Sequence, residues 1–144
     1  MEAKMQLNTL MANMFATGLL DDQFRQLQIL HEGSSPDFIT EIITLFCMEG
    51  EGIINDLAKL LNKPFVDFNK VDTLLYRLQG SSATVGAQRV KDTCIQFHKF
   101  CQDNTRYGCL DTLDVVRNDF YDLRSKFQIM VQLEQQVWTF YRKH

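Results

Sequence analysis

The stretch FNKVDTLLYRLQGSSATVG, residues 68–86, decides the fold. Its apolar side chains recur every three or four residues, which is the spacing of one face of an α-helix. Asp67 stands directly before the run, where a carboxylate can cap the first turn, and Gly86 can close the last turn. The stretch therefore predicts an amphipathic helix whose inward row is Phe68, Val71, Leu75, Leu78, Ser82 and Val85.

The segments that follow repeat this pattern and predict two more helices. A short inward row spans residues 90–101, and a longer row at near-heptad spacing spans residues 113–137. The members of the first row are Val90, Cys94, Phe97 and Cys101, and those of the second are Leu113, Val116, Phe120, Leu123, Phe127, Met130 and Val137.

The N-terminal third predicts two shorter helices. Gly18 lies near the end of the first, where a glycine can adopt the left-handed conformation of a helix cap. Asp21 or Asp22 can cap the second, which stops before Gly33. The inward residues are Met5, Leu7, Leu10, Met11, Met14 and Phe15 in the first helix and Phe24, Leu27 and Leu30 in the second.

A third helix begins at Ser35-Pro36-Asp37, which offers a hydroxyl cap, a proline for the first helical position and a carboxylate at the positive end of the helix dipole. Gly50 and Gly52 lie in its interior and indicate a bend or a close contact with a neighbouring helix. Lys63-Pro64 ends it. Its inward residues are Phe38, Ile39, Ile42, Ile43, Phe46, Ile53, Leu57, Leu60 and Leu61.

Four long helices joined by short connections favour antiparallel neighbours. We therefore predict an all-α fold, an antiparallel four-helix bundle with two additional N-terminal helices. The six helices form a single domain over residues 1–144.

Charge and hydropathy exclude several classes of function. The formal net charge is −3, but residues 76–106 carry a local excess of +3. A small basic island on an acidic chain argues against a nucleic-acid binder and suits one acidic partner surface, with a solvated helix face as the alternative. No apolar run approaches the ~18 residues of a membrane span. The island comprises Arg77, Arg89, Lys91, Lys99 and Arg106.

The four cysteines form no C-x-x-C pair, which favours reduced, mostly buried thiols in an intracellular protein. Cys94, His98 and Cys101 share one face of a predicted helix and could supply three zinc ligands. No clear fourth ligand lies near them in the sequence, and both cysteines already belong to an apolar row. We therefore predict no metal and no cofactor. A metal- or cofactor-binding bundle is the alternative from another functional class.

Residues 75–90, LYRLQGSSATVGAQRV, carry a specific motif. Gly80-Ser81-Ser82 followed by Gly86–Val90 strongly resembles the motif of plant histidine-containing phosphotransfer proteins, H-Q-L-K-G-S-S and then I-G-A-Q-R-V. The resemblance covers nearly the whole chain, including its length and its long last helix. It implies a helical bundle with a four-helix core and extra N-terminal helices.

The chain departs from this motif at the position where the family is phosphorylated. The family's histidine falls on Tyr76, its next residue, a glutamine, on Arg77, and its lysine on Gln79. The sequence therefore looks like a pseudo-phosphotransfer protein, which keeps the scaffold and lacks the acceptor. No catalytic residue is predicted.

The residues themselves support the same conclusion. At about 100° per residue, Tyr76 lies about 130° from the centre of the inward row and points to solvent. A tyrosine hydroxyl with a pKa of about 10 is almost wholly protonated and is a weak nucleophile, whereas a neutral imidazole can attack a phosphoaspartate. Neutral Gln79 cannot offset phosphoryl charge as an ammonium does.

The resemblance also implies the partners, which are receiver domains of hybrid sensor histidine kinases and of response regulators in a cytokinin-type two-component phosphorelay. The chain is expected to be a non-enzymatic, monomeric competitor of active relay proteins in the cytoplasm and nucleus. The alternative is a relay mediator that acts through another residue or as a scaffold. The expected partner-binding residues are Tyr76, Arg77, Gln79, Gly80, Ala83 and Arg89, with Met14, Leu19 and Leu20 as candidates on the N-terminal helices.

Overall fold

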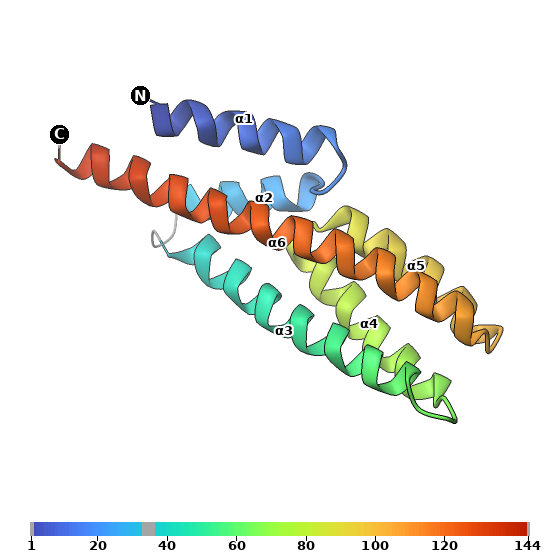
Figure 1. Ribbon diagram of the computed structural model, residues 1–144. Helices are drawn as coiled ribbons and strands as arrows, with labels where there is room; N and C mark the ends of the chain where they lie inside the picture. The colour runs from blue at the N-terminus through green and yellow to red at the C-terminus, as the bar shows by residue number, and fades with distance from the viewer. Residues whose placement is uncertain (1, 33–36, 144) are drawn as a thin grey trace.

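The computed structural model describes residues 2–32 and 37–143, and these residues form six α-helices. Helices α3 to α6 lie side by side as an antiparallel bundle, α1 runs along the C-terminal half of α6, and α2 lies behind α6 (Figure 1). The prediction of a four-helix bundle with two additional N-terminal helices is confirmed. The helices are α1 (Glu2–Ala16), α2 (Asp22–Glu32), α3 (Phe38–Leu61), α4 (Phe68–Val85), α5 (Gln88–Gln102) and α6 (Arg106–Lys143).

Most of the predicted helix ends are found. The Asp67 side chain accepts a hydrogen bond of 3.2 Å from the Lys70 backbone N–H, and Asp21 accepts one of 2.9 Å from that of Gln23. Gly18 and Gly86 have φ angles of 75° and 73°, the left-handed conformation expected of glycine caps. Asp37 is the N-cap of α3 but makes no side-chain cap hydrogen bond, and the predicted cap at Ser35-Pro36 lies outside the described residues.

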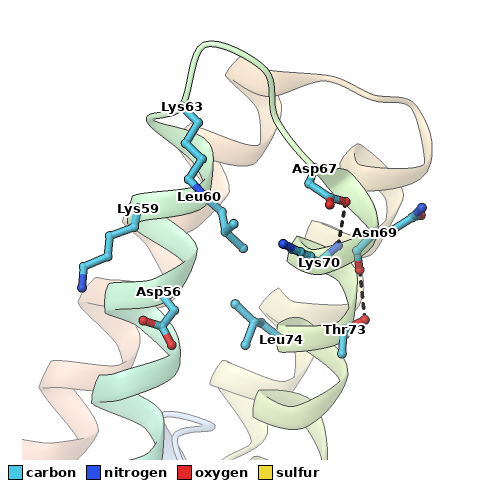
Figure 2. A pocket seen from close by; sticks show the side chains of 9 residues that line it. All are labelled: Asp56, Lys59, Leu60, Lys63, Asp67, Asn69, Lys70, Thr73 and Leu74. Atoms are coloured by element: carbon cyan, nitrogen blue, oxygen red, sulfur yellow. Dashed lines mark hydrogen bonds between the residues drawn. The ribbon is translucent and has the colours of Figure 1, made fainter.

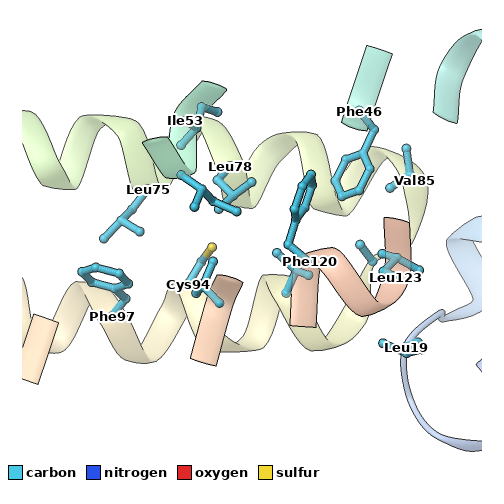
Figure 3. Packing of buried hydrophobic residues seen from close by; sticks show 14 of the residues in the cluster. Leu19, Phe46, Ile53, Leu75, Leu78, Val85, Cys94, Phe97, Phe120 and Leu123 are labelled. Atoms are coloured by element: carbon cyan, nitrogen blue, oxygen red, sulfur yellow. The ribbon is translucent and has the colours of Figure 1, made fainter. Parts of the chain in front are cut away.

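The predicted inward rows form one continuous core. Figure 3 shows side chains of α3, α4, α5 and α6 packing together, with the Phe46 and Phe120 rings 5.6 Å apart at their centroids. Two residues assigned to the inward rows are exposed instead, Met5 and Leu30. Met5 lies on α1, which packs mainly against α6 and meets α2 through Phe15 near its C-terminal end, so little of the α1 surface around Met5 is covered.

The two glycines inside α3 have different roles. A Cβ atom at Gly50 would lie 2.8 Å from Phe120 Cζ, whereas a Cβ atom at Gly52 would meet no atom within 4 Å. Real Cβ atoms essentially never approach other heavy atoms that closely, so only glycine lets α3 approach α6 at this point. The prediction of a close helix contact is confirmed for Gly50 alone.

Two backbone hydrogen bonds join the α1–α2 connection to the α4–α5 connection. The Asp21 N–H donates to the Gly86 carbonyl oxygen at 3.0 Å, and the Gln88 N–H donates to the Leu19 carbonyl oxygen at 3.1 Å. The docking candidates Met14, Leu19 and Leu20 are almost completely buried beside this junction. The expectation that they are exposed for docking is therefore wrong, because they anchor the N-terminal helices to the bundle.

Candidate functional site

Tyr76 lies on the outer face of α4, as the helical spacing predicts, and is 60% exposed. One face of its ring packs against the His98 ring of α5, with the ring centroids 4.1 Å apart and the planes inclined by 38°. Tyr76 is therefore a supported aromatic side chain, held on one side and open to solvent on the other.

His98 is itself held by α4. Its Nδ1 atom donates a hydrogen bond to Asp72 Oδ1, and the residue is only 8% exposed. Because an ionised carboxylate only accepts hydrogen bonds, the proton of a neutral His98 ring lies on Nδ1. Nε2 is buried and has no hydrogen-bond partner among the described residues.

The helical spacing places His98 on one face of α5 with Cys94 and Cys101 but does not reveal this arrangement. Asp72 and Tyr76 are one helical turn apart, which places them on the same side of α4. That spacing was a signal that both could contact one side chain of a neighbouring helix. The identity of that side chain depends on the register between α4 and α5.

Four other predicted site residues lie around Tyr76 on α4, and we call the five together the Tyr76 surface. Arg77 and Ala83 are exposed, and the Arg77 guanidinium lies 3.7 Å from the Glu49 carboxylate of α3. Gln79 is half-buried, and its Oε1 atom has no hydrogen-bond partner. A Cβ atom at Gly80 would meet nothing within 4 Å, so the helix backbone is accessible there. The Tyr76 surface comprises Tyr76, Arg77, Gln79, Gly80 and Ala83.

Arg89, the sixth predicted site residue, does not lie with these five. Its guanidinium donates to the Thr17 carbonyl oxygen and lies 4.0 Å from Asp119 and 3.9 Å from Asp122 on α6. Burial raises the pKa of Asp119, and the Arg89 charge opposes that rise. The structure therefore places Arg89 apart from the Tyr76 surface, where it projects toward α6 and connects it to the end of α1, and its predicted role in partner binding stays a prediction.

Arg89→Glu is expected to lower the free energy of unfolding by about 1–2 kcal/mol. The change removes a charged donor and brings a further carboxylate toward Asp119 and Asp122. The expected loss is kept small because the Arg89 side chain is 37% exposed. Arg77→Glu is the matched control, with a loss below about 1 kcal/mol, because both members of its ion pair are solvated. Urea denaturation followed by circular dichroism measures both, and equal losses would contradict the structural role of Arg89.

The basic island is largely neutralised within the chain. Besides Arg77 and Arg89, Lys91 lies 3.8 Å from Asp21. Arg106 donates to the Lys63 carbonyl oxygen at 2.5 Å and to that of Pro64 at 2.8 Å, which satisfies backbone groups after α3. Lys99, by contrast, is exposed. The charge excess seen in the sequence is therefore spread over several intramolecular contacts, and Arg77 is its one member on the Tyr76 surface.

Residues 2–32 and 37–143 contain no set of side chains that would support the metal-binding alternative. No group of three or more His, Cys, Asp or Glu side chains there could hold an ion. Cys94 is completely buried, and burial raises the pKa of its thiol to about 12. Cys101 Sγ contacts Cys109 Sγ at 3.8 Å, and burial raises the pKa of both thiols. His98 is hydrogen-bonded to Asp72, so two of the three predicted ligands, His98 and Cys101, already have partners within the protein.

A cleft of about 630 Å³ separates α3 and α4 near their connecting turn, away from Tyr76. Figure 2 shows Leu60 and Leu74 facing each other across it, with the Thr73 hydroxyl donating to the Asn69 carbonyl oxygen at 3.0 Å. Asp67 is the cap of α4. The polar side chains that line the cleft are carboxylates, ammonium groups, one amide and one hydroxyl, with no histidine or cysteine among them. None of the described helices is both long and apolar enough to cross a membrane.

The sequence matches the Hpt domain family over residues 41–126. It is similar to histidine-containing phosphotransfer protein 1 of Oryza sativa subsp. japonica, with 61% identity over 139 residues, 96% of this chain and 95% of the rice protein. It is also similar to pseudo histidine-containing phosphotransfer protein 6 of Arabidopsis thaliana, with 37% identity over 131 residues, 90% of this chain and 85% of that protein.

The fold is likewise similar to a solved structure. The crystal structure of a histidine-containing phosphotransfer protein from maize superimposes with a TM-score of 0.92 at 57% sequence identity, covering 94% of this chain and 99% of the maize chain. The similarity spans nearly all of both chains, so it includes the two N-terminal helices as well as the four-helix bundle.

Proposed function

This chain belongs to the family of plant histidine-containing phosphotransfer proteins, and we propose that it is a pseudo member that binds receiver domains without relaying phosphate. Proteins of this family mediate two-component phosphorelays by interacting with receiver domains of kinases and response regulators. The observation that carries the proposal is the tyrosine on the exposed face of α4 where the family motif has its histidine.

The chemistry of the Tyr76 surface supports binding without transfer. The Tyr76 hydroxyl is a poor nucleophile near neutral pH and would form a phosphate ester, which is a poor donor for onward transfer. Gln79 brings no positive charge to the incoming phosphoryl group. The nearest described imidazole, His98, is buried beneath the Tyr76 ring and hydrogen-bonded to Asp72. Acceptor and cation are therefore both missing.

The same surface retains what docking needs. Tyr76 presents an exposed aromatic ring, a side-chain type enriched at the energetic centre of protein interfaces. Gly80 leaves the backbone open one turn further along α4, and Ala83 adds only a methyl group. A receiver bound here is withheld from active relay proteins, so the chain acts as a competitive negative regulator of cytokinin-type signalling. We place it, as a monomer, in the cytoplasm and nucleus.

Gly80→Gln is expected to weaken receiver binding at least about 10-fold, because a side chain of this size would stand in the open approach to the α4 backbone. Gly80→Ala is the matched control. Alanine gains about 1 kcal/mol of helix propensity over glycine, at least as much as glutamine does, but it adds a single methyl group and is expected to cause a smaller loss of affinity. Titration calorimetry with a purified receiver domain measures both affinities. Unchanged binding by the glutamine variant would place the interface elsewhere on the chain.

The relay alternative rests on relatives whose names carry no pseudo prefix, such as the rice protein at 61% identity. It needs an acceptor other than the residue at position 76. His98 is buried, while the side chains of His31 and His144 lie outside the described residues. Incubation with a phosphorylated receiver separates the two functions. We expect the wild-type chain to bind without taking up acid-labile phosphate, and label on any histidine at relay-like rates would favour the alternative.

A further inference from the structure

We propose that His98, fixed by Asp72, is a positioning residue that holds the Tyr76 ring in the orientation in which receivers dock. The inference rests on the proposed function and deepens it by adding two residues beneath the docking surface. Neither residue needs to touch a receiver. They act by restricting the ring that does.

The geometry links the three side chains in series. Asp72 and Tyr76 extend from the same side of α4, and the His98 side chain of α5 lies against both. The hydrogen bond from Nδ1 to Asp72 restricts rotation of the imidazole, and the imidazole covers one face of the tyrosine ring at a centroid distance of 4.1 Å. The opposite face and edge of the ring account for its 60% exposure.

A purely structural role does not explain why the buried residue is a histidine. Its Nε2 atom is buried without a hydrogen-bond partner, which costs free energy that a leucine at the same place would not incur. An imidazole brings two properties that leucine lacks: a flat face for stacking and an Nδ1 donor for the Asp72 carboxylate. Both properties are used, and both bear on the orientation of Tyr76.

An oriented ring loses less conformational freedom when a partner immobilises it. Immobilising one side chain with several rotamers weakens binding by about 3- to 10-fold. In the free chain the stack has already removed part of that freedom. Substituting His98 or Asp72 is therefore expected to weaken receiver binding by about 3- to 10-fold in a chain that carries Tyr76. The same substitution is expected to have no effect in a chain that lacks the tyrosine.

The stack itself is tested without any receiver. In proton NMR spectra of the full chain, the ring protons of His98 are expected to resonate upfield, because the imidazole centroid lies only 4.1 Å from that of the Tyr76 ring, within reach of its ring current. Tyr76→Ala should abolish this shift, and Asp72→Ala should reduce it. Asp92→Ala is the matched control, since it removes one carboxylate from the surface of α5 that is hydrogen-bonded to Gln88. No change in the His98 resonances on Tyr76→Ala would overturn the proposal.

The positioning role is tested by a double-mutant cycle on receiver affinity, with the wild type, Asp72→Ala, Tyr76→Ala and the double variant. Asp72 is partly exposed, so its substitution leaves the core intact, and His98→Leu provides a second probe that fills the same space. We expect Asp72→Ala and His98→Leu each to weaken binding about 3- to 10-fold in the wild type and to have no effect beside Tyr76→Ala.

The outcomes separate the two proposals. Equal effects with and without the tyrosine would show that Asp72 and His98 contact the receiver directly or support the fold in general, and would overturn the positioning role alone. Complete absence of receiver binding by the wild-type chain would overturn the proposed function and, with it, the docking role of the stack.

Discussion

A chain carrying Tyr76→His and Gln79→Lys is expected to take up acid-labile phosphate from a phosphorylated receiver, whereas the wild-type chain takes up none. The new imidazole stands at an exposed position, and histidine titrates near neutrality, so a useful fraction of it is a nucleophile. Residue 79 is half-buried, but the long stem of a lysine can carry its ammonium out to the surface beside the phosphoryl group. Gly80 already leaves the backbone clear for the partner.

The measurement is a time course of label moving from the receiver to wild-type, single-variant and double-variant chains. Tyr76→His alone should recover some acceptance, and the lysine should raise the rate by on the order of 10-fold or more through its charge. Mass spectrometry must place the label on residue 76 and not on neighbouring His98. Circular dichroism confirms that each variant is folded. A folded double variant that stays unlabelled would mean that other parts of the surface have also diverged, or that position 76 is not the acceptor position.

Gly50→Leu is expected to destabilise the bundle by about 3 kcal/mol or more. Even the first carbon of the new side chain would overlap the Phe120 ring, which is completely buried and packs against Phe46. The ring cannot move aside without opening the core between α3 and α6. The cost of this steric overlap exceeds the stabilisation of about 1 kcal/mol that leucine brings through its higher helix propensity than glycine.

Gly52→Leu is the matched control for this prediction, because it lies two residues along the same helix with open space at its Cβ position. It should leave stability unchanged or raise it by up to about 1 kcal/mol. Urea denaturation of both variants decides the matter. Similar losses at the two positions would show that helix propensity, rather than the contact with Phe120, controls the result.

The sequence contains enough information to predict the fold because each helix carries its own signals. The row from Val71 to Val85, the cap at Asp67 and the left-handed Gly86 are local features, and all are found. The wrong predictions of buried residues concern how much of each helix surface is covered by neighbouring helices. Met5 matches a helical stripe, yet α1 packs mainly on α6, and periodicity does not reveal how much of a helix its neighbours cover.

The site was predictable in part for the same reason. The outward position of Tyr76 follows from its angle on one helix. The position of Arg89 does not, because an exposed residue of α5 can face either α4 or α6, and the handedness of the bundle decides which. Its contacts with Asp119 and Asp122 show that it faces α6. The stack of Tyr76 on His98 likewise depends on the register of two helices.

The packing of α1 against α6 has a consequence for the chain while it is being synthesised. Helix α1 is synthesised before α6, its main packing partner, and about 90 residues separate the end of α1 from the start of α6. At about 5–20 residues per second, the apolar strip of α1 that ends at Met14 lacks this partner for at least roughly 5–20 seconds, because α1 lies along the C-terminal half of α6. Helix α6 must therefore be synthesised before α1 can dock on it, whereas α2 contacts α3 and α4, which precede α6. This order makes α1 a segment to which a nascent-chain chaperone has a long opportunity to bind.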